Sequence, residues 1–163
     1  MAERKASEAK PGQYLTFILK SQPYGVPIGA VREINRVSDI TPVPQTPSFV
    51  AGVINLRGKV IPVVDLRLKF GMDAAPRTKA TCTIVIEGTD GQVGMIVDSV
   101  SGVADLTAAQ IEPTPVLGDQ EKLSFVMGMG KVENQVLILL DIVHALSKEN
   151  LTQYLTEPLK TAA

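Results

Sequence analysis

The sequence predicts an all-β protein made of two small five-stranded barrels. Hydrophobic residues make up 45% of the 163-residue chain but aromatic residues only 4%. The core must therefore be packed by Val, Ile and Leu, which favour strands. Short apolar segments alternate with Gly and Pro along the chain, which is typical of strands joined by turns. In addition, one stretch of sequence occurs twice, because residues 49–66 align with residues 125–142 without a gap.

The repeat predicts two half-size modules. Five positions are identical, namely Phe49/Phe125, Val50/Val126, Gly52/Gly128, Val60/Val136 and Asp65/Asp141. We expect a first half over residues 13–78 and a second half over 79–150, with a tail over 1–12 and a helix end and tail over 151–163. A unit of about 60 to 70 residues with five short strands has the size of an SH3-like barrel. The corners of the two copies differ, since residues 55–59 read NLRGK and residues 131–135 read KVENQ.

The first half divides into two hairpins and an extended segment. Strands over 14–19 and 26–28 flank a turn at 21–25, and the polar residues before them form a flexible tail. Residues 38–48 contain three prolines, which fit only edge strands, bulges or extended loops. A hairpin then turns through residues 55–59, and Gly58 supplies a positive φ. Asp65 caps a helical turn over 66–70 that Gly71 ends.

The second half follows the same plan after a connector over residues 72–79. Strands over 83–87 and 93–97 flank a turn at 88–91. Thr107 and Gln110 have the spacing of a capping box and predict a single helical turn. The second copy of the repeat forms another hairpin. Apolar residues spaced over 141–155 then predict one or two amphipathic helices.

Composition excludes several classes of function. The net charge of −1 and the scarcity of aromatic residues argue against nucleic-acid binding. No apolar run approaches the roughly 20 residues that cross a membrane, and the charged N-terminal residues do not resemble a secretory signal, so we expect a cytoplasmic protein. Cys82 lies in a strand-like segment, where a buried thiol is favoured over a reactive one. A single cysteine allows no disulfide within the chain.

The residues that enzymes use are scarce. The chain has one histidine and one cysteine, and too few ligands at workable spacing for zinc. The segment GMGK at 128–131 lacks the Ser or Thr and the first glycine of a phosphate loop. Asp65, Asp98 and Asp141 follow apolar runs, where aspartates usually cap turns and helices. We therefore expect no catalytic residue, no cofactor and no metal. A small hydrolase that uses His144 and Asp141 is the enzyme alternative.

Arg57 at the first corner has two interpretations. It can be a solvated turn residue. Alternatively, its planar five-donor fork, held on a short rigid loop, grips a carboxylate or carbonyl of a partner protein. The second copy carries Glu133 at this corner and could not do the same.

The segment from Phe49 to Gly58, FVAGVINLRG, followed by VIPVVDL at 60–66, resembles the signature of the chemotaxis coupling protein CheW family. Further matches are YGV at 24–26, VREI at 31–34 and GMIVD at 94–98, with Val103, Leu106 and Ile111. The resemblance covers about residues 13 to 150. No kinase or receiver segment accompanies it, which favours the free adaptor over the homologous regulatory domain of the histidine kinase CheA.

The resemblance implies a non-enzymatic adaptor of two SH3-like barrels that joins methyl-accepting chemoreceptors to CheA, in the cytoplasm at membrane-associated receptor arrays. It implies no cofactor, small-molecule substrate or direct membrane insertion. The positions that match the receptor-binding region are Val31, Glu33, Gly52, Asn55, Arg57, Gly58 and Val103. The kinase contact is assigned more loosely to first-half loops around Ile40 to Val43 and to edges of the second half. Service in a parallel pathway, such as pilus motility or surface sensing, stays open, as does the question whether strands cross between the halves.

Overall fold

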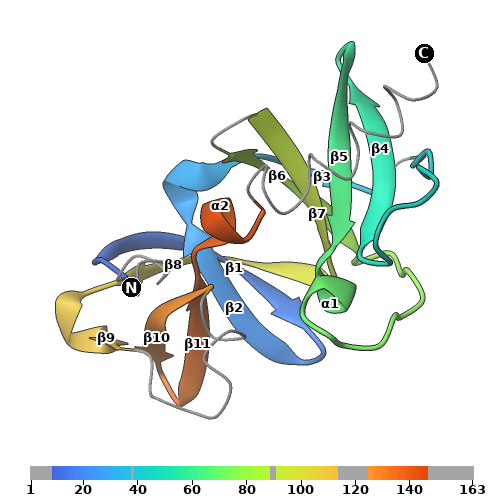
Figure 1. Ribbon diagram of the computed structural model, residues 1–163. Coiled ribbons are helices and arrows are strands. Elements are labelled where there is room, and N and C mark those ends of the chain that lie inside the picture. Colours follow the sequence, from blue (N-terminus) through green and yellow to red (C-terminus); the bar gives the residue numbers. More distant parts are fainter. Residues whose placement is uncertain (1–8, 38, 89–90, 114–124, 147–163) are drawn as a thin grey trace, which may run out of the picture.

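The computed structural model describes residues 9–37, 39–88, 91–113 and 125–146, and within this part the protein is almost entirely β-structure. A six-stranded sheet has the order β8-β1-β2-β11-β10-β9, and a five-stranded sheet has the order β3-β6-β7-β5-β4 (Figure 1). The strands are β1 (Gly12–Leu19), β2 (Gln22–Pro27), β3 (Val31–Arg36), β4 (Val50–Leu56), β5 (Lys59–Asp65), β6 (Cys82–Gly88), β7 (Gly91–Val97), β8 (Ser99–Leu106), β9 (Ile111–Glu112), β10 (Val126–Val132) and β11 (Gln135–Leu140).

Each sheet closes on itself in the same way. The chain that leaves edge strand β8 turns through the 3₁₀ helix η2 (Ala108–Gln110) and returns as β9 to pair with β10. In the five-stranded sheet the chain beyond β3 returns to β4 through a bridge between Thr41 and Val53. The prediction of two barrels is thus confirmed. One has six strands and not five, because β9 is a short strand where the other sheet has only a bridge.

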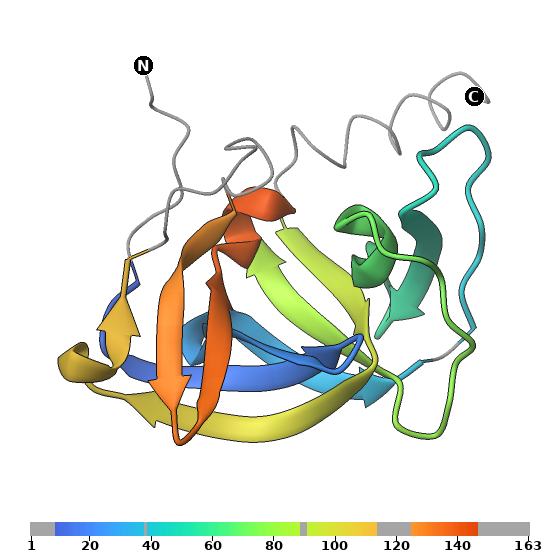
Figure 2. The same ribbon diagram turned by 90° about the horizontal axis from the view of Figure 1, so that it is seen from below.

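The two halves of the chain exchange their first hairpins. The β1–β2 hairpin pairs with β8 and with β11, both from the second half. Reciprocally, the β6–β7 hairpin pairs with β3 and β5 of the first half. Strands therefore cross between residues 13–78 and 79–150 in both sheets, which answers the question that the sequence left open (Figures 1 and 2).

The duplicated segments have matching structures. Asp65 N–H donates to Phe49 O, and Asp141 N–H donates to Phe125 O, each at 2.8 Å. The β4–β5 pair has a bulge at Gly52, and the β10–β11 pair has one at Gly128. A Cβ at Gly52 would lie 2.2 Å from Thr41 O, and one at Gly128 would lie 2.8 Å from Glu112 O. The identical glycines thus admit the returning chain that closes each barrel.

Three apolar clusters fill the interior. The largest lies between the sheets and takes Phe17 and Leu19 from one sheet and Ile84 and Met95 from the other. A second cluster is confined to the five-stranded sheet and contains Ile54, Ile61, Val63, Val85 and Ile96. A third belongs to the six-stranded sheet and contains Tyr14, Leu106, Leu137 and Leu139. Each barrel therefore has a core of its own, and the large shared core joins the barrels.

The turns show where local sequence signals succeed and where they fail. The expected hairpin over 82–97 and the capping box of Thr107 and Gln110 are present. The first hairpin turns at Lys20 and Ser21, which both have positive φ, and not at 21–25. β2 runs on through this predicted turn, because Gly25 packs against Leu139 of the neighbouring strand.

Short helices follow both copies of the repeat. The side chain of Asp65 accepts from Leu68 N–H at the start of α1 (Leu66–Lys69), and Gly71 follows with a φ of 80°. Helix α2 (Ile142–Ala145) begins the predicted C-terminal helix, whose continuation to 155 lies outside the described residues. A further 3₁₀ helix, η1 (Ile28–Ala30), joins β2 to β3.

Two expectations at the edges of elements need correction. The tail predicted over 1–12 extends too far, because Ala9 N–H donates to Met127 O at 3.3 Å and β1 begins at Gly12; residues 1–8 lie outside the described part. Cys82 is half-buried and not buried, since it lies at the first position of β6, and its thiol approaches Ala80 O at 3.2 Å.

Candidate binding site on the Arg57 hairpin

The β4–β5 turn holds Arg57 in a fixed backbone conformation. Arg57 has a φ of 52° and Gly58 a φ of 87°, which is the pattern of a two-residue type I′ turn. The Asn55 side chain accepts from Gly58 N–H at 2.9 Å, and this hydrogen bond stabilises the turn. The sequence predicted the positive φ of Gly58, but not that Arg57 also enters the left-handed region, which costs a residue with a Cβ conformational energy.

The Arg57 side chain forms an ion pair with Glu33 of β3. Arg57 Nη1 donates to Glu33 Oε2 at 2.5 Å, and Arg57 Nη2 donates to Glu33 Oε1 at 2.8 Å. Asn35 Nδ2 donates to the same carboxylate at 3.1 Å. The Arg57 guanidinium, followed by Asn35, lowers the pKa of Glu33, and the carboxylate in turn raises the pKa of Arg57. At neutral pH the pair is therefore fully charged.

The exposure of the two side chains shows which one can meet a partner. The Arg57 side chain is 72% exposed, whereas that of Glu33 is 20% exposed. Glu33 occupies two of the five N–H donors of the guanidinium, so the others are available to an incoming acceptor. Because the carboxylate fixes the plane of the fork, a partner meets a donor array that is already oriented.

The equivalent turn of the second copy has the same shape and different chemistry. Glu133 takes the place of Arg57 and has a φ of 54°. Lys131 Nζ lies 2.6 Å from Glu112 Oε2, so this tip is also tied to the strand beside it. The two valines that follow the turns, Val60 and Val136, are 67% and 52% exposed. The charge at the apex therefore distinguishes two hairpins of similar geometry.

The structure gathers four of the seven residues expected at the receptor surface. Hydrogen bonds connect Glu33 with Arg57 and Asn55 with Gly58 at one end of the five-stranded sheet. Val31 is half-buried at the start of β3. Gly52 is buried against the Thr41 backbone, so its position indicates a packing role. Val103 is 55% exposed, but it belongs to β8 in the other sheet.

The two residues expected at the kinase surface are partly used in packing. Ile40 is half-buried against the cluster inside the five-stranded sheet. Val43 is half-buried against the core shared by the two barrels. Both lie in the segment that closes the barrel, and Thr46 Oγ1 donates to Val43 O at 2.9 Å. These contacts hold the loop and leave part of each side chain exposed.

Sequence reasoning missed Asn35 and a second charged network. Asn35 lies two residues after Glu33 on the same face of β3, and this spacing is the signal that could have identified it.

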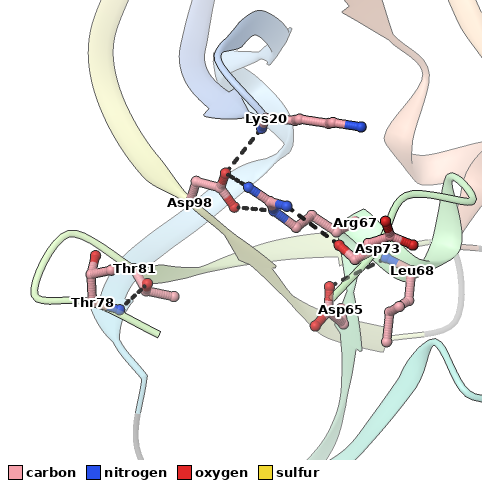
Figure 3. Close-up of polar contacts among 8 residues, drawn as sticks. All are labelled: Lys20, Asp65, Arg67, Leu68, Asp73, Thr78, Thr81 and Asp98. Carbon is pink, nitrogen blue, oxygen red and sulfur yellow. Dashed lines mark hydrogen bonds and ion pairs between the residues drawn. The ribbon is translucent and has the colours of Figure 1, made fainter. Parts of the chain in front are cut away.

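The second charged network joins Arg67 and Asp98. Arg67 of α1 donates to both oxygens of Asp98, through Nε at 2.8 Å and Nη2 at 2.6 Å. Figure 3 shows this network between α1, the end of β7 and the β1–β2 turn. No local pattern marks a pair that the fold brings together from distant segments.

The phenylalanines of the repeat are also placed by the fold. The Lys69 ammonium lies 4.4 Å from the centre of the Phe49 ring and 5.6 Å from that of Phe125. Both rings are half-buried and pack against the shared core. Burial lowers the pKa of Lys69. The repeated phenylalanines thus flank a cation where the two copies meet.

The described residues contain no group of three or more His, Cys, Asp or Glu side chains that could hold a metal ion. Among them, likewise, no helix is long and apolar enough to cross a membrane. Helix α2 carries His144, whose side chain lies outside the described part of the chain. What the described surface presents is an oriented cation on a rigid hairpin, which suits protein recognition.

Comparison with known proteins identifies the family. Residues 13–150 match the family described as CheW-like domain. The chemotaxis protein CheW of Klebsiella aerogenes is 37% identical over 146 residues, which cover 90% of this chain and 88% of that protein. The crystal structure of the scaffolding protein TtCheW from Thermoanaerobacter tengcongensis superposes with a TM-score of 0.76 at 34% identity, covering 86% of this chain and 95% of that one. Protein FrzA of Myxococcus xanthus is 36% identical over 116 residues, 70% of this chain and 72% of that protein.

The fold and the family match together define a scaffolding protein built from two β-barrels, in a family without enzymatic activity. The chain belongs to the CheW family, and it is a chemotaxis adaptor that couples receptors to the kinase CheA. This result confirms the fold class, the adaptor function and the absence of an enzymatic role that the sequence predicted. The hydrolase alternative with His144 and Asp141 is wrong, because the family is a family of scaffolding proteins.

Proposed function

We propose that the hairpin carrying Arg57 is the receptor-binding centre of this adaptor. The surface consists of Glu33, Asn55, Arg57 and Gly58 at the end of the five-stranded sheet, extended by Val31 and Val103. Gly52 supports it from the interior, where it admits the Thr41 backbone. The observation that carries the proposal is the pair of hydrogen bonds by which half-buried Glu33 fixes the exposed Arg57 fork. An exposed arginine normally loses side-chain entropy when a partner binds it, and a fork that is already fixed loses less.

The pairing with Glu33 also limits the chemistry of the partner. Glu33 neutralises Arg57, so a second carboxylate would meet a repelling negative charge beside the fork. A backbone carbonyl or a side-chain amide accepts from the remaining N–H groups without that repulsion. We therefore narrow the expected contact from carboxylate or carbonyl to a neutral oxygen acceptor. The exposed Val103 adds apolar area that suits the side of a helix.

The kinase contact is proposed for the loop that contains Ile40 and Val43. This loop lies in the segment that closes the five-stranded barrel, and both side chains are partly exposed. The partner would be the regulatory domain of CheA, in the cytoplasm at the receptor arrays. Receptor and kinase would then contact different places on the adaptor, which could hold both at once.

Arg57→Glu tests the receptor surface, and Lys59→Glu is its matched control. Both residues are exposed in the same hairpin, Arg57 in its turn and Lys59 at the start of β5, and both changes reverse one charge, but only Arg57 pairs with Glu33. We expect Arg57→Glu to weaken binding of a receptor tip fragment by about tenfold to a hundredfold, the range of an interface hot spot. Lys59→Glu should change it less than about threefold.

Three controls complete this test. Circular dichroism must show that both variants fold. CheA phosphorylation in the presence of receptor should follow the binding result, with stimulation lost for Arg57→Glu and retained for Lys59→Glu. Raising the salt concentration should have little effect on wild-type binding, because a neutralised pair attracts neutral acceptors. Equal losses in the two charge-reversal variants would show that net charge, and not the oriented fork, determines binding.

A second candidate is the same adaptor role in a parallel chemosensory pathway. The observation that favours it is that one relative at 36% identity over 70% of the chain, FrzA of Myxococcus xanthus, has a name other than chemotaxis protein CheW. Fold and hairpin geometry would be the same in both cases. Identification of the kinase that copurifies with the protein from its own cells would separate them, since a CheA from a different signalling cluster would support the second candidate.

A further inference from the structure

The chain passes from one barrel to the other at Asp98. Strand β7 ends at Val97 in the five-stranded sheet, and β8 begins at Ser99 in the six-stranded sheet. Asp98 is therefore the single residue between two strands of different barrels. Its backbone N–H donates to Ile18 O of β1 at 3.1 Å, so the crossover is already held by the six-stranded sheet.

The Asp98 carboxylate bonds to both barrels. Arg67 of α1, which follows β5 in the five-stranded sheet, donates to it through Nε and Nη2 at 2.8 and 2.6 Å. Lys20 N–H, in the β1–β2 turn of the six-stranded sheet, donates to Asp98 Oδ2 at 2.9 Å. Arg67 Nη1 also donates to Asp73 O at 3.3 Å, which fixes the guanidinium from its other side (Figure 3). We call these bonds the Asp98 network.

The ion pair of Arg67 and Asp98 is more enclosed than the pairs Arg32–Glu87 and Lys131–Glu112. The side chains of Arg67 and Asp98 are 18% and 29% exposed, compared with 54% and 40% for the surface pair of Arg32 and Glu87. Two parallel bonds between a planar fork and a carboxylate fix orientation as well as distance. The apolar core between the barrels holds them together but is not directional. The Asp98 network therefore adds an orientation that the shared core does not.

Of the two passages between the barrels that the structure describes, only the one at Asp98 has an ion pair. The other passage between barrels, from β2 to β3, runs through Pro27, Ile28, Gly29 and Ala30, which have no ionisable side chain. In the second copy of the repeat, Val143 takes the position of Arg67. The charged crossover is the one that leads directly into β8, the strand that carries Val103.

We infer that Arg67 and Asp98 are positioning residues that set β8, and with it Val103, relative to the Arg57 hairpin. This inference rests on the proposed receptor surface, whose polar part lies on the five-stranded sheet and whose exposed Val103 lies on the six-stranded sheet. A receptor helix that touches both parts requires them at a fixed separation. The kinase loop around Ile40 and Val43 belongs to the segment that closes the five-stranded barrel, so a kinase that binds this loop does not have to touch β8 at the same time.

The test compares Asp98→Asn and Arg67→Met with Asp105→Asn. Asn keeps an acceptor for Lys20 N–H but loses the charge, and Met keeps the apolar stem of Arg67. Asp105 is an exposed aspartate of β8, so its replacement controls for the loss of one negative charge on that strand. The distance measurement uses a Cys82→Ser background with spin labels attached at Lys59→Cys and Ser101→Cys. Pulsed electron paramagnetic resonance then measures the distance between the Arg57 hairpin and β8.

We expect one narrow distance distribution for the background protein and for Asp105→Asn, and broader or shifted distributions for Asp98→Asn and Arg67→Met. The same two variants, without labels, should bind a receptor tip fragment about threefold to tenfold more weakly and bind the CheA regulatory domain with unchanged affinity. This split separates positioning from stability, because a general loss of folded protein would lower both affinities together.

An unchanged distance distribution in both network variants would overturn the inference, as would an equal loss of receptor and kinase binding. Arg57→Glu, measured in parallel, separates this inference from the proposed function. If Arg57→Glu binds the receptor normally, the receptor surface is wrong whatever the distances show. If Arg57→Glu fails to bind and the network variants bind normally, the receptor surface stands and the positioning role is refuted.

Discussion

Replacement of Gly52 by Ala should be among the most destabilising single-methyl changes in this protein. The new Cβ would lie 2.2 Å from Thr41 O, 2.8 Å from Thr41 C and 2.9 Å from Ile40 Cγ2. The nearest of these atoms are backbone atoms, which cannot rotate away as a side chain would. Thr41 and Val53 exchange two backbone hydrogen bonds of 2.9 Å at this point, and these bonds close the five-stranded barrel.

The expected cost follows from two contributions. Gly52 has a φ of 144°, where an alanine is strained by about 1 to 3 kcal/mol. To relieve the overlap the chain must separate Thr41 from Val53, and the loss of two backbone hydrogen bonds costs about 1 kcal/mol each. The sum is about 3 to 5 kcal/mol, a large part of the stability of a domain of this size.

Gly102→Ala is the matched control for this prediction. Gly102 has a φ of 150°, almost the same as Gly52, but a Cβ there would have no neighbouring atom within 4 Å. Urea unfolding of both variants should therefore differ by about 2 kcal/mol or more, which is the part due to the close approach. If the two variants unfold within about 0.5 kcal/mol of each other, the argument that the glycine exists to admit the returning chain is wrong.

Three further predictions concern the core, the Asp98 network and a cap. Phe49→Ala should lower the free energy of unfolding by about 2 kcal/mol, roughly half the loss in Phe17→Ala, because Phe49 is half-buried and Phe17 is fully buried. Equal losses for the two variants in thermal unfolding would contradict this prediction. Arg67 lowers the folded-state pKa of Asp98 below its unfolded value of about 3.9. The ion pair therefore contributes fully to the free energy of unfolding above that pH, and its contribution decreases as the pH falls through the folded-state pKa. The difference in unfolding free energy between wild type and Asp98→Asn, about 1 to 2 kcal/mol at neutral pH, should therefore shrink below about pH 4, and a constant difference would exclude the ion pair as its source. Gln110→Ala should lower the free energy of unfolding by about 1 kcal/mol, because the Gln110 side chain accepts from Thr107 N–H at 2.8 Å. No change in urea unfolding would show that η2 is held by other contacts.

Much of the local structure could be predicted, because adjacent residues determine it. Asp65 caps α1 through a bond to Leu68 N–H three residues later, and Thr107 and Gln110 form their box within one turn. The type I′ turn at Gly58 likewise depends on its own residues. The repeat gave the number of barrels, since two copies of a segment that cannot bury its apolar face alone imply two similar units.

The sequence could not show which strands pair. The β1–β2 hairpin could complete the barrel of its own half or that of the other half, and the alternation of apolar residues is the same in both cases. Gly25 illustrates the limit. In the sequence it resembles a turn residue, but in the structure it gives Leu139 room to pack, at 3.1 Å from the position of its missing Cβ. Gly94 is placed in the same way opposite Val63, as expected for equivalent hairpins.

The candidate site was predictable to the extent that its residues share one segment. Asn55, Arg57 and Gly58 stand together in the signature, and their turn geometry follows from it. The partner that orients Arg57 comes from β3, outside that segment, and only the closure of the barrel brings it within hydrogen-bonding distance. The resemblance named Glu33 as a receptor residue. Its geometry suggests instead that it acts through Arg57, since it is the less exposed member of the pair.

The two copies of the repeat show how a duplicated fold can acquire a directional binding surface. Both turns place their apex residue at a φ near 50°, with 52° for Arg57 and 54° for Glu133, and both are followed by an exposed valine. The backbone therefore offers a partner two similar shapes. If the Arg57 hairpin is the receptor site, the side chain at the apex must discriminate between them, because Glu133 offers only acceptors where Arg57 offers N–H donors. A protein with two unequal ends of this kind can join different neighbours on its two sides, which a self-complementary pair of surfaces could not do.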